Sequence, residues 1–310
     1  EYDIETLGKL IGHEADAEEV VKNMEDQILH ALIFDGNAAM LMINASDATG
    51  EAKKLLNLSD GVTCALGRLF CAGAMLAQRN KSESEKLTLI LSGGGPAGKL
   101  LVTADNAGNV KGCADVPDAC KLQQNVSVPA VVGKDGQLTV IRDNPKGEPY
   151  VGVCNLVSGD ITRDFAAYLV TSEQQPAAVA LDAGFRDGKT VCGGIMVLPL
   201  PGCPDGVIDK IEEKISKTDD LLDKMLYHLS LEEMAFDMFW DVGVKPLETV
   251  PMQYKCDCSR ERFESGLISL GKKELRSLAA ENKDTEVCCR FCNKKYVFTP
   301  EEIDQLAKGI

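Results

Sequence analysis

Four cysteines near the C-terminus are the residues whose types and spacing could do chemistry. Cys256 and Cys258 form a Cys-x-Cys pair, and Cys289 and Cys292 form a Cys-x-x-Cys pair thirty residues later. Side chains two apart in an extended segment point to the same side, and a tight turn brings the second pair together. The intervening GKKELRSLAAENK is predicted to be helical, so the chain can fold back and unite the pairs.

Four thiolates arranged in this way are typical of a zinc site. Sulfur ligands at about 2.3 Å in a tetrahedron suit zinc and leave no open position for water. The three histidines, His13, His30 and His228, lie elsewhere in the sequence. We therefore predict one structural Cys₄ zinc site and no hydrolytic centre. A disulfide pair is the structural alternative, and a redox switch would visit both states.

Cys288 complicates the ligand set because it directly precedes Cys289. It is an alternative ligand, but a Cys-x-x-Cys turn chelates better than Cys-x-x-x-Cys, so Cys289 is preferred. About fifty residues with few large apolar side chains supply little core, and structural zinc contributes roughly 10–16 kcal/mol in comparable peptides. Oxidation of the thiolates would remove the ligands, release the metal and unfold this segment.

Composition excludes several classes of function. The 310 residues are 45% hydrophobic and 26% charged, with a net charge of -15, which disfavours a phosphate-binding surface and hence nucleic acid. No apolar run is long enough for a membrane span, and the acidic start lacks the features of a secretory signal. Scattered cysteines, as in GVTCALGRLFCAGAML, are interpreted as small core residues, and the reducing cytosol is the favoured compartment.

Upstream of residue 205, strands and helices are expected to alternate irregularly, which indicates an α+β fold. Strands are predicted around the turn at Asp35-Gly36, then over 87–155 with hairpin signals at Asn106 to Gly108 and at Asp135-Gly136, and again over 177–200. Helices are predicted for 45–56, for the nearly apolar 60–78 and for 162–174. Residues 1–27 are interpreted as an acidic N-terminal extension, a peripheral helix.

The segment 205–250 changes character and is predicted to be a helical linker. Ile208, Ile211 and Ile215 share one helical face, and Ser230 with Glu233 indicates a capping box. The segment ends in MAFDMFWDV, where aromatic residues are concentrated. Packing of the apolar stripe on its own domain is the simpler interpretation. The other is a detachable linker that covers, and can uncover, an apolar surface.

The glycine-rich SGGGPAGKL has the spacing of a phosphate-binding loop from Gly93 to Lys99. Leu100 stands where a hydroxyl should bind magnesium, and a strand rather than a helix is expected next. A glycine-rich hairpin turn is therefore the better interpretation.

The sequence resembles the heat-shock protein 33 family of redox-regulated bacterial chaperones from about residue 28 to the end. The resemblance rests mainly on ALGR at 65–68, GGGPAGKLLVTADNAGNVKG at 93–112, YVGVCNLVSGDITRDFAAYLVTSEQQP at 150–176, CDCSRERF and CRFCNKKYVF. It implies an α+β mixed-sheet core (1–204), a helical linker (205–250) and a small zinc-binding redox-switch domain (251–310). By position, the zinc ligands of the family correspond to the four cysteines named above.

The resemblance also implies a function. Members are ATP-independent holdases, inactive when reduced and zinc-bound, in which oxidation forms disulfides within each pair, here Cys256–Cys258 and Cys289–Cys292. Zinc leaves, the linker loosens, and apolar surface binds unfolding proteins; activated members are commonly homodimers. The residues that bind clients are not identified, and the eight further cysteines, Cys288 especially, are open to other disulfides.

Two other classes of function compete with this one. A zinc-stabilised module for protein or nucleic-acid interaction explains the cysteines, but its nucleic-acid form conflicts with the net charge. An enzyme needs convergent acid, base or nucleophilic groups, and no such motif is recognisable. We expect a cytoplasmic, non-enzymatic chaperone with no nucleic-acid or membrane partner.

Overall fold

The structure is a computed structural model that describes residues 25–80, 82, 85–123, 126–144, 147–218, 220–227 and 230–309. The predicted helix of the N-terminal extension lies outside these residues. The chain divides into two compact units between Tyr254 and Lys255, and each is described by itself. The observed mixture of sheets and helices confirms the predicted α+β class.

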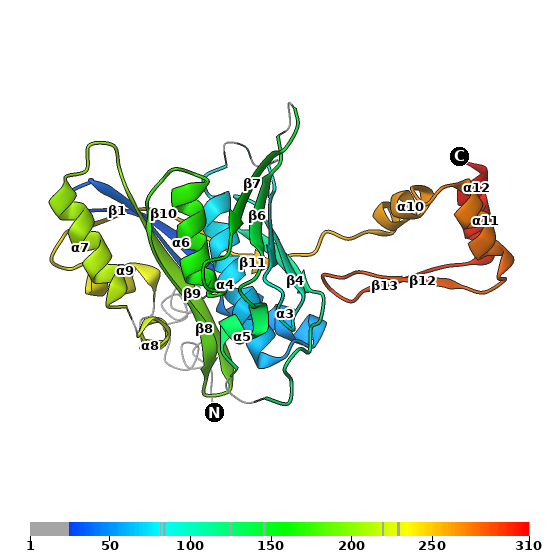
Figure 1. The fold of residues 1–310 in the computed structure, drawn as a ribbon, viewed down its shortest axis with the longest axis horizontal. Helices are drawn as coiled ribbons and strands as arrows, with labels where there is room; N and C mark the ends of the chain where they lie inside the picture. Colours follow the sequence, from blue (N-terminus) through cyan, green and yellow to red (C-terminus); the bar gives the residue numbers. More distant parts are fainter. Residues whose placement is uncertain are drawn as a thin grey trace, which may run out of the picture. The chain divides into compact units, whose positions relative to one another are not determined.

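Five strands of the described chain form the first sheet of the larger unit (Figure 1). In spatial order they are β10 (Val244–Pro251), β1 (Gln27–Ile33), β2 (Ala38–Asn44), β9 (Lys189–Pro199) and β8 (Ala178–Arg186). All neighbouring pairs are antiparallel. The β1–β2 hairpin turns at Asp35-Gly36, as predicted, and both residues have positive φ.

The second sheet of the larger unit has six strands among the residues that the structure describes. In spatial order they are β11 (Gln253–Tyr254), β5 (Asn109–Ala114), β4 (Lys99–Ala104), β3 (Leu87–Ser92), β6 (Gln137–Arg142) and β7 (Tyr150–Asn155). Only the β11–β5 pair is parallel. The glycine-rich loop joins β3 to β4 as a hairpin, and Gly94 and Gly98 take the left-handed φ that this turn requires. No helix follows it, which agrees with the rejection of a phosphate-binding loop.

One hairpin prediction was wrong. Asp135-Gly136 does not join two paired strands, because α5 (Val128–Val132) precedes it and β6 pairs with β3 and β7. The apolar AVV that suggested a strand forms the end of α5 instead. Pro129 stands in the first turn of that helix, where its fixed φ and missing N–H favour a helical start.

Helix α4 (Asp60–Ala77) is the centre of the larger unit. It contacts β8 and β9 of the first sheet and β3, β4 and β5 of the second. Its length and composition would suit a membrane span, yet 83% of the helix is buried inside the unit, as expected for a core helix that is apolar all round. Helices α3 (Ser46–Leu56) and α6 (Ile161–Thr171) flank it.

The segment that follows β9 packs on the other face of the first sheet (Figure 1). It contains α7 (Asp205–Ser216), α8 (Leu221–Tyr227) and α9 (Leu231–Met238), and the side chain of Ser230 caps α9 by accepting from Glu233 N–H. The helical prediction fails after residue 238, because 244–251 form β10. This strand carries Pro246 and Pro251, and prolines are tolerated at a sheet edge.

The smaller unit begins at Lys255 and surrounds the cysteine cluster. Its elements are α10 (Arg260–Ile268), α11 (Lys272–Ala280), β12 (Thr285–Cys288), β13 (Lys295–Phe298) and α12 (Pro300–Lys308). The predicted helix between the cysteine pairs is α11, whereas α10 was not predicted. A capping box begins α12: the Thr299 side chain accepts from Glu302 N–H, and the Glu302 side chain accepts from Thr299 N–H.

Asp26 joins the start of β1 to two other segments. Its carboxylate accepts hydrogen bonds from the N–H groups of Asp47 and Ala48 in the first turn of α3, and its carbonyl accepts from Met252 N–H after β10. It thereby replaces the missing side-chain cap of α3. Burial raises the pKa of Asp26 from 3.8 to about 7, because desolvation outweighs these backbone hydrogen bonds.

This shift predicts a pH-dependent stability. Between about pH 4 and about pH 7 the folded chain holds a proton on Asp26 that the unfolded chain releases, so the contribution is complete below that window and is lost as pH rises through it. The wild type should lose up to about 1.4 kcal/mol per pH unit more than Asp26→Asn, which does not titrate. Urea unfolding of both proteins, kept reduced, across this range measures the difference. Parallel pH profiles would contradict it.

Candidate metal centre

Two different local structures present the four cysteines. Cys256 and Cys258 lie in an extended segment between β11 and α10, which places both sulfurs on one side, as predicted. Cys289 and Cys292 lie in the loop of the β12–β13 hairpin. Hydrogen bonds from Cys289 N–H to the Lys294 carbonyl and from Asn293 N–H to the Cys289 carbonyl close this loop. Asn293 has a φ of 56°, a left-handed conformation that asparagine tolerates.

The four sulfur atoms all lie within 4.8 Å of one another. The Sγ atoms of Cys256 and Cys289 are 3.6 Å apart, and those of Cys258 and Cys292 are 3.5 Å apart. A tetrahedron with metal–sulfur bonds of about 2.3 Å has edges of about 3.8 Å. The cluster therefore has the size of a tetrahedral thiolate site, and both close contacts join one cysteine pair to the other.

The electrostatics of three of the four thiols, those of Cys256, Cys258 and Cys292, also suit a cation. Burial tends to raise the pKa of Cys258, but hydrogen bonds from Tyr296 and the other three cysteines outweigh it and lower this pKa to about 7. Burial instead raises the pKa of Cys256, and raises that of Cys292 to about 11. One thiol thus ionises at the expense of its neighbours, and a divalent ion among the sulfurs would allow all four to be thiolates.

Tyr296 is a supporting residue that the sequence did not reveal. Its Oη lies 3.3 Å from Cys258 Sγ and donates to the Cys258 carbonyl at 3.1 Å. The contact with the sulfur raises the pKa of the phenol to about 12, so the hydroxyl stays protonated. The ring packs against Phe263 with centroids 4.8 Å apart. Such contacts around the ligands fix their orientation.

The apolar core of the smaller unit is small. Its buried members are Leu267, Leu275, Tyr296, Phe298, Ile303 and Ala307. The guanidinium of Arg260 lies 4.2 Å from the centre of the Phe298 ring and binds Glu302, which ties α10 to α12. A core of six buried side chains supplies little hydrophobic stabilisation to a unit of 56 residues. A metal bound by the cysteine cluster would add a cross-link where the apolar core is small.

Cys288 takes no part in the cluster. The metal-binding group found among the described residues consists of the four predicted cysteines, whereas Cys288 is exposed at the end of β12. Successive side chains of a strand point to opposite faces, so Cys288 points away when Cys289 points inward. The preference for Cys289 agrees with this geometry.

Comparison with known proteins gives a consistent result. The profile of the family described as Hsp33 protein matches residues 26–299. A 33 kDa chaperonin of Alkaliphilus metalliredigens is 35% identical over 290 residues, which cover 91% of this chain and 99% of that protein. One from Caldanaerobacter subterraneus subsp. tengcongensis is 36% identical over 292 residues, 92% of this chain and 99% of its own.

A solved structure agrees with these relatives. The crystal structure of a 33 kDa chaperonin, a heat shock protein 33 homolog from Thermotoga maritima, superposes with a TM-score of 0.81 at 28% identity. The match covers 92% of this chain and 98% of that one. The fold and the relatives define a chaperone, a non-enzymatic class, which confirms the expectation that the chain is not an enzyme. The chain belongs to the Hsp33 family.

The geometry predicts which thiols bind metal. Cys289→Ser should abolish stoichiometric zinc binding, because Cys289 is the buried ligand of the cluster, whereas Cys288→Ser should leave one zinc per chain. Metal analysis after dialysis measures both, and the adjacent serine variant controls for the substitution itself. Loss of zinc in Cys288→Ser with retention in Cys289→Ser would reverse the assignment.

Proposed function

We propose that this protein is a redox-regulated, ATP-independent holdase with one zinc ion bound by Cys256, Cys258, Cys289 and Cys292. The observation that carries the proposal is the cluster of four sulfurs within 4.8 Å in a unit with few buried apolar side chains. Zinc is the metal of choice because soft thiolates in a closed tetrahedron select it and leave no site for catalysis.

Oxidation is the event that would open this unit. In our proposal, disulfides form between Cys256 and Cys258 and between Cys289 and Cys292. Each disulfide forms from two thiolates and releases two electrons, and a peroxide takes these up together with two protons from the solvent to give two molecules of water. Disulfide sulfurs no longer act as thiolate ligands, so the four cysteines would no longer hold a zinc ion. The small core of the unit then lacks the metal that supplements it.

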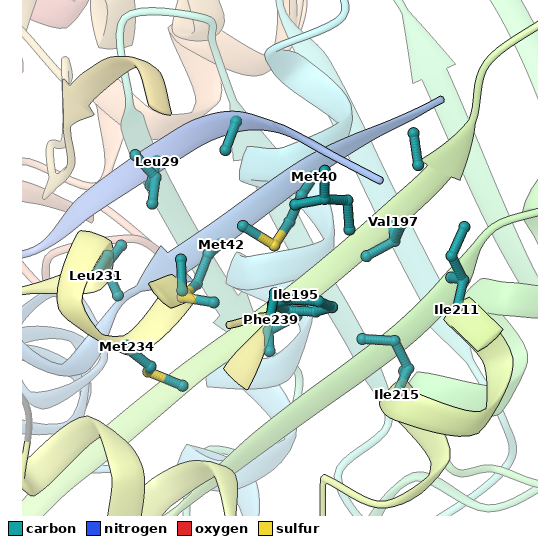
Figure 2. Packing of buried hydrophobic residues seen from close by; sticks show 14 of the residues in the cluster. Leu29, Met40, Met42, Ile195, Val197, Ile211, Ile215, Leu231, Met234 and Phe239 are labelled. Carbon is teal, nitrogen blue, oxygen red and sulfur yellow. The ribbon is translucent and has the colours of Figure 1, made fainter. Parts of the chain in front are cut away.

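The linker supplies the surface that oxidation would uncover. Apolar side chains of α7, α9 and the residue after α9 meet the face of the first sheet formed by β1, β2 and β9 (Figure 2). The labelled members are Leu29, Met40, Met42, Ile195 and Val197 from the strands, and Ile211, Ile215, Leu231, Met234 and Phe239 from the linker. This interface matches a detachable cover over an apolar surface.

The linker helices depend on this interface for their own stability. They are 12, 7 and 8 residues long, and isolated helices of such lengths are marginal in water. Their ion pairs, such as Lys214 with Asp241 and Lys224 with Asp237, lie near the surface and contribute little. An undocked linker would therefore lose its helices and expose the sheet face together with its own apolar residues.

Unfolding proteins are the partners that such a surface suits. An apolar face binds the side chains that an unfolding client exposes, and methionines adapt to varied shapes. The net charge of -15 keeps the complexes soluble and disfavours nucleic acid. We place the reduced form in the cytoplasm, where thiols persist, with no membrane partner, and expect the activated form to be a homodimer.

Zinc, thiols and aggregation measured on one sample test the proposal. Mild peroxide treatment should release one zinc, consume the four cluster thiols and start suppression of aggregation of a heat-unfolding test protein; the reduced protein should be inactive. Reduction with zinc added back is the control for damage. If zinc is released but aggregation of the test protein is not suppressed, the chaperone proposal fails and a zinc-stabilised interaction module is the remaining interpretation. Full suppression of aggregation by the reduced protein would overturn the proposed redox switch.

The linker interface predicts a variant that is active without oxidant. Phe239 is fully buried against the first sheet, so Phe239→Ala should weaken docking by about 3–5 kcal/mol and give holdase activity in the reduced, zinc-bound protein. Phe236 in the same segment is 47% exposed, and Phe236→Ala is the matched control with little effect. Inactive, zinc-bound Phe239→Ala with increased proteolysis of the linker would show that undocking alone is insufficient.

A further inference from the structure

A second thiol pair lies in the core of the larger unit. The Sγ atoms of Cys71 on α4 and Cys192 on β9 are 3.6 Å apart, although 121 positions separate the residues in the sequence. Both side chains are fully buried. Every second residue of β9 faces the same side of the sheet. Ile195 and Val197 face the linker, so Cys192 faces the opposite side, where α4 lies.

The two elements approach closely at this point. A side-chain carbon added at Gly67, one turn before Cys71, would come within 2.9 Å of Cys192 Sγ, so the glycine lets α4 lie against β9. Ser46, the first residue of α3, binds β9 at the same position, because its hydroxyl accepts from Cys192 N–H. The sulfurs, 3.6 Å apart, need to approach by about 1.5 Å to reach the disulfide bond length of about 2.05 Å.

From this geometry we propose that Cys71 and Cys192 form a third disulfide, which fastens the central helix to the first sheet in the oxidised protein. A peroxide oxidises one thiol to a sulfenic acid and leaves as water. The sulfur of the second thiol then attacks the sulfenic sulfur, forms the S–S bond and expels the second water molecule. Two electrons and two protons pass from the thiols to the peroxide, as the balance requires.

Burial makes this pair the slower of the two redox sites. Desolvation raises the pKa of Cys71 well above the ordinary range, so the reactive thiolate is scarce, and no solvent reaches either sulfur. The pair should therefore oxidise after the cysteines of the metal centre, under stronger oxidant or at temperatures that open the core transiently. Its formation needs neither the metal centre nor chaperone activity, so it stands apart from the proposed function.

The consequence is a core that resists heat when the switch is open. A cross-link that closes a loop of this length restricts the unfolded chain strongly. The zinc-free, oxidised larger unit should melt roughly 5–15 °C higher with the disulfide than without it. The part of the protein that holds clients would then be most stable under the oxidising heat stress that unfolds those clients.

Peptide mapping of the full chain tests the pair. The protein is oxidised with peroxide at graded temperatures and, separately, refolded in oxidised glutathione, where access to the thiols is not limiting. Remaining thiols are alkylated under denaturing conditions, and a non-reducing digest is analysed for the Cys71–Cys192 peptide pair. Zinc is measured in parallel, so failure of the switch and failure of this proposal give different patterns.

In the wild type, the linked peptide should form after zinc release, and the melting temperature should rise with it. Both Cys71→Ala and Cys192→Ala should lose the linked peptide and the higher melting temperature. Cys113→Ala removes a buried sulfur from β5 and should retain both properties. Alkylated Cys71 and Cys192 after complete refolding in oxidised glutathione would overturn the proposal. A link from Cys192 to Cys64, or a linked peptide with unchanged melting, would overturn the assigned partner or the stabilising role.

Discussion

The first sheet is apolar on both faces, and the rest of the larger unit follows from the need to cover them. Helix α4 covers one face and is in turn covered by the second sheet, so that side is a permanent core. The linker covers the other face with short helices that bury only a few side chains each, among them Ile211 and Leu231, and with Phe239 just after α9. The two covers differ in how firmly they are held, and the proposed switch acts on the weaker one.

The cysteine cluster and the linker solve the same physical problem in different ways. The smaller unit has too little apolar surface to fold securely, and four thiols supply a place where one ion can cross-link its two halves. The linker helices are too short to persist alone and depend on the sheet. In both parts, folding rests on a partner that can be removed, whereas α4 is enclosed on all sides.

The sequence allowed the cluster of four cysteines to be predicted, because spacing alone brings Cys256 near Cys258 and Cys289 near Cys292. It also predicted α4, whose composition is apolar throughout. The supporting role of Tyr296 was not predicted, because a tyrosine in an alternating strand looks like any core residue. Its contact with Cys258 depends on tertiary folding. Strand β10 was not predicted because prolines and charges hide its alternating pattern. It forms by pairing with β1, which is distant in the sequence.

The order of the strands also dictates an order of folding. β1 pairs with β2 within a hairpin, yet β2 must wait for β9, and β1 acquires β10 only when residue 251 is available. Such distant pairings cost loop-closure entropy and form late. During synthesis from the N-terminus, the linker is therefore laid onto a sheet whose other strands are already present. The linker, which packs last on this sheet, can leave without breaking the hydrogen bonds among β1, β2, β9 and β8. Its return repeats the final step in the original folding of this sheet.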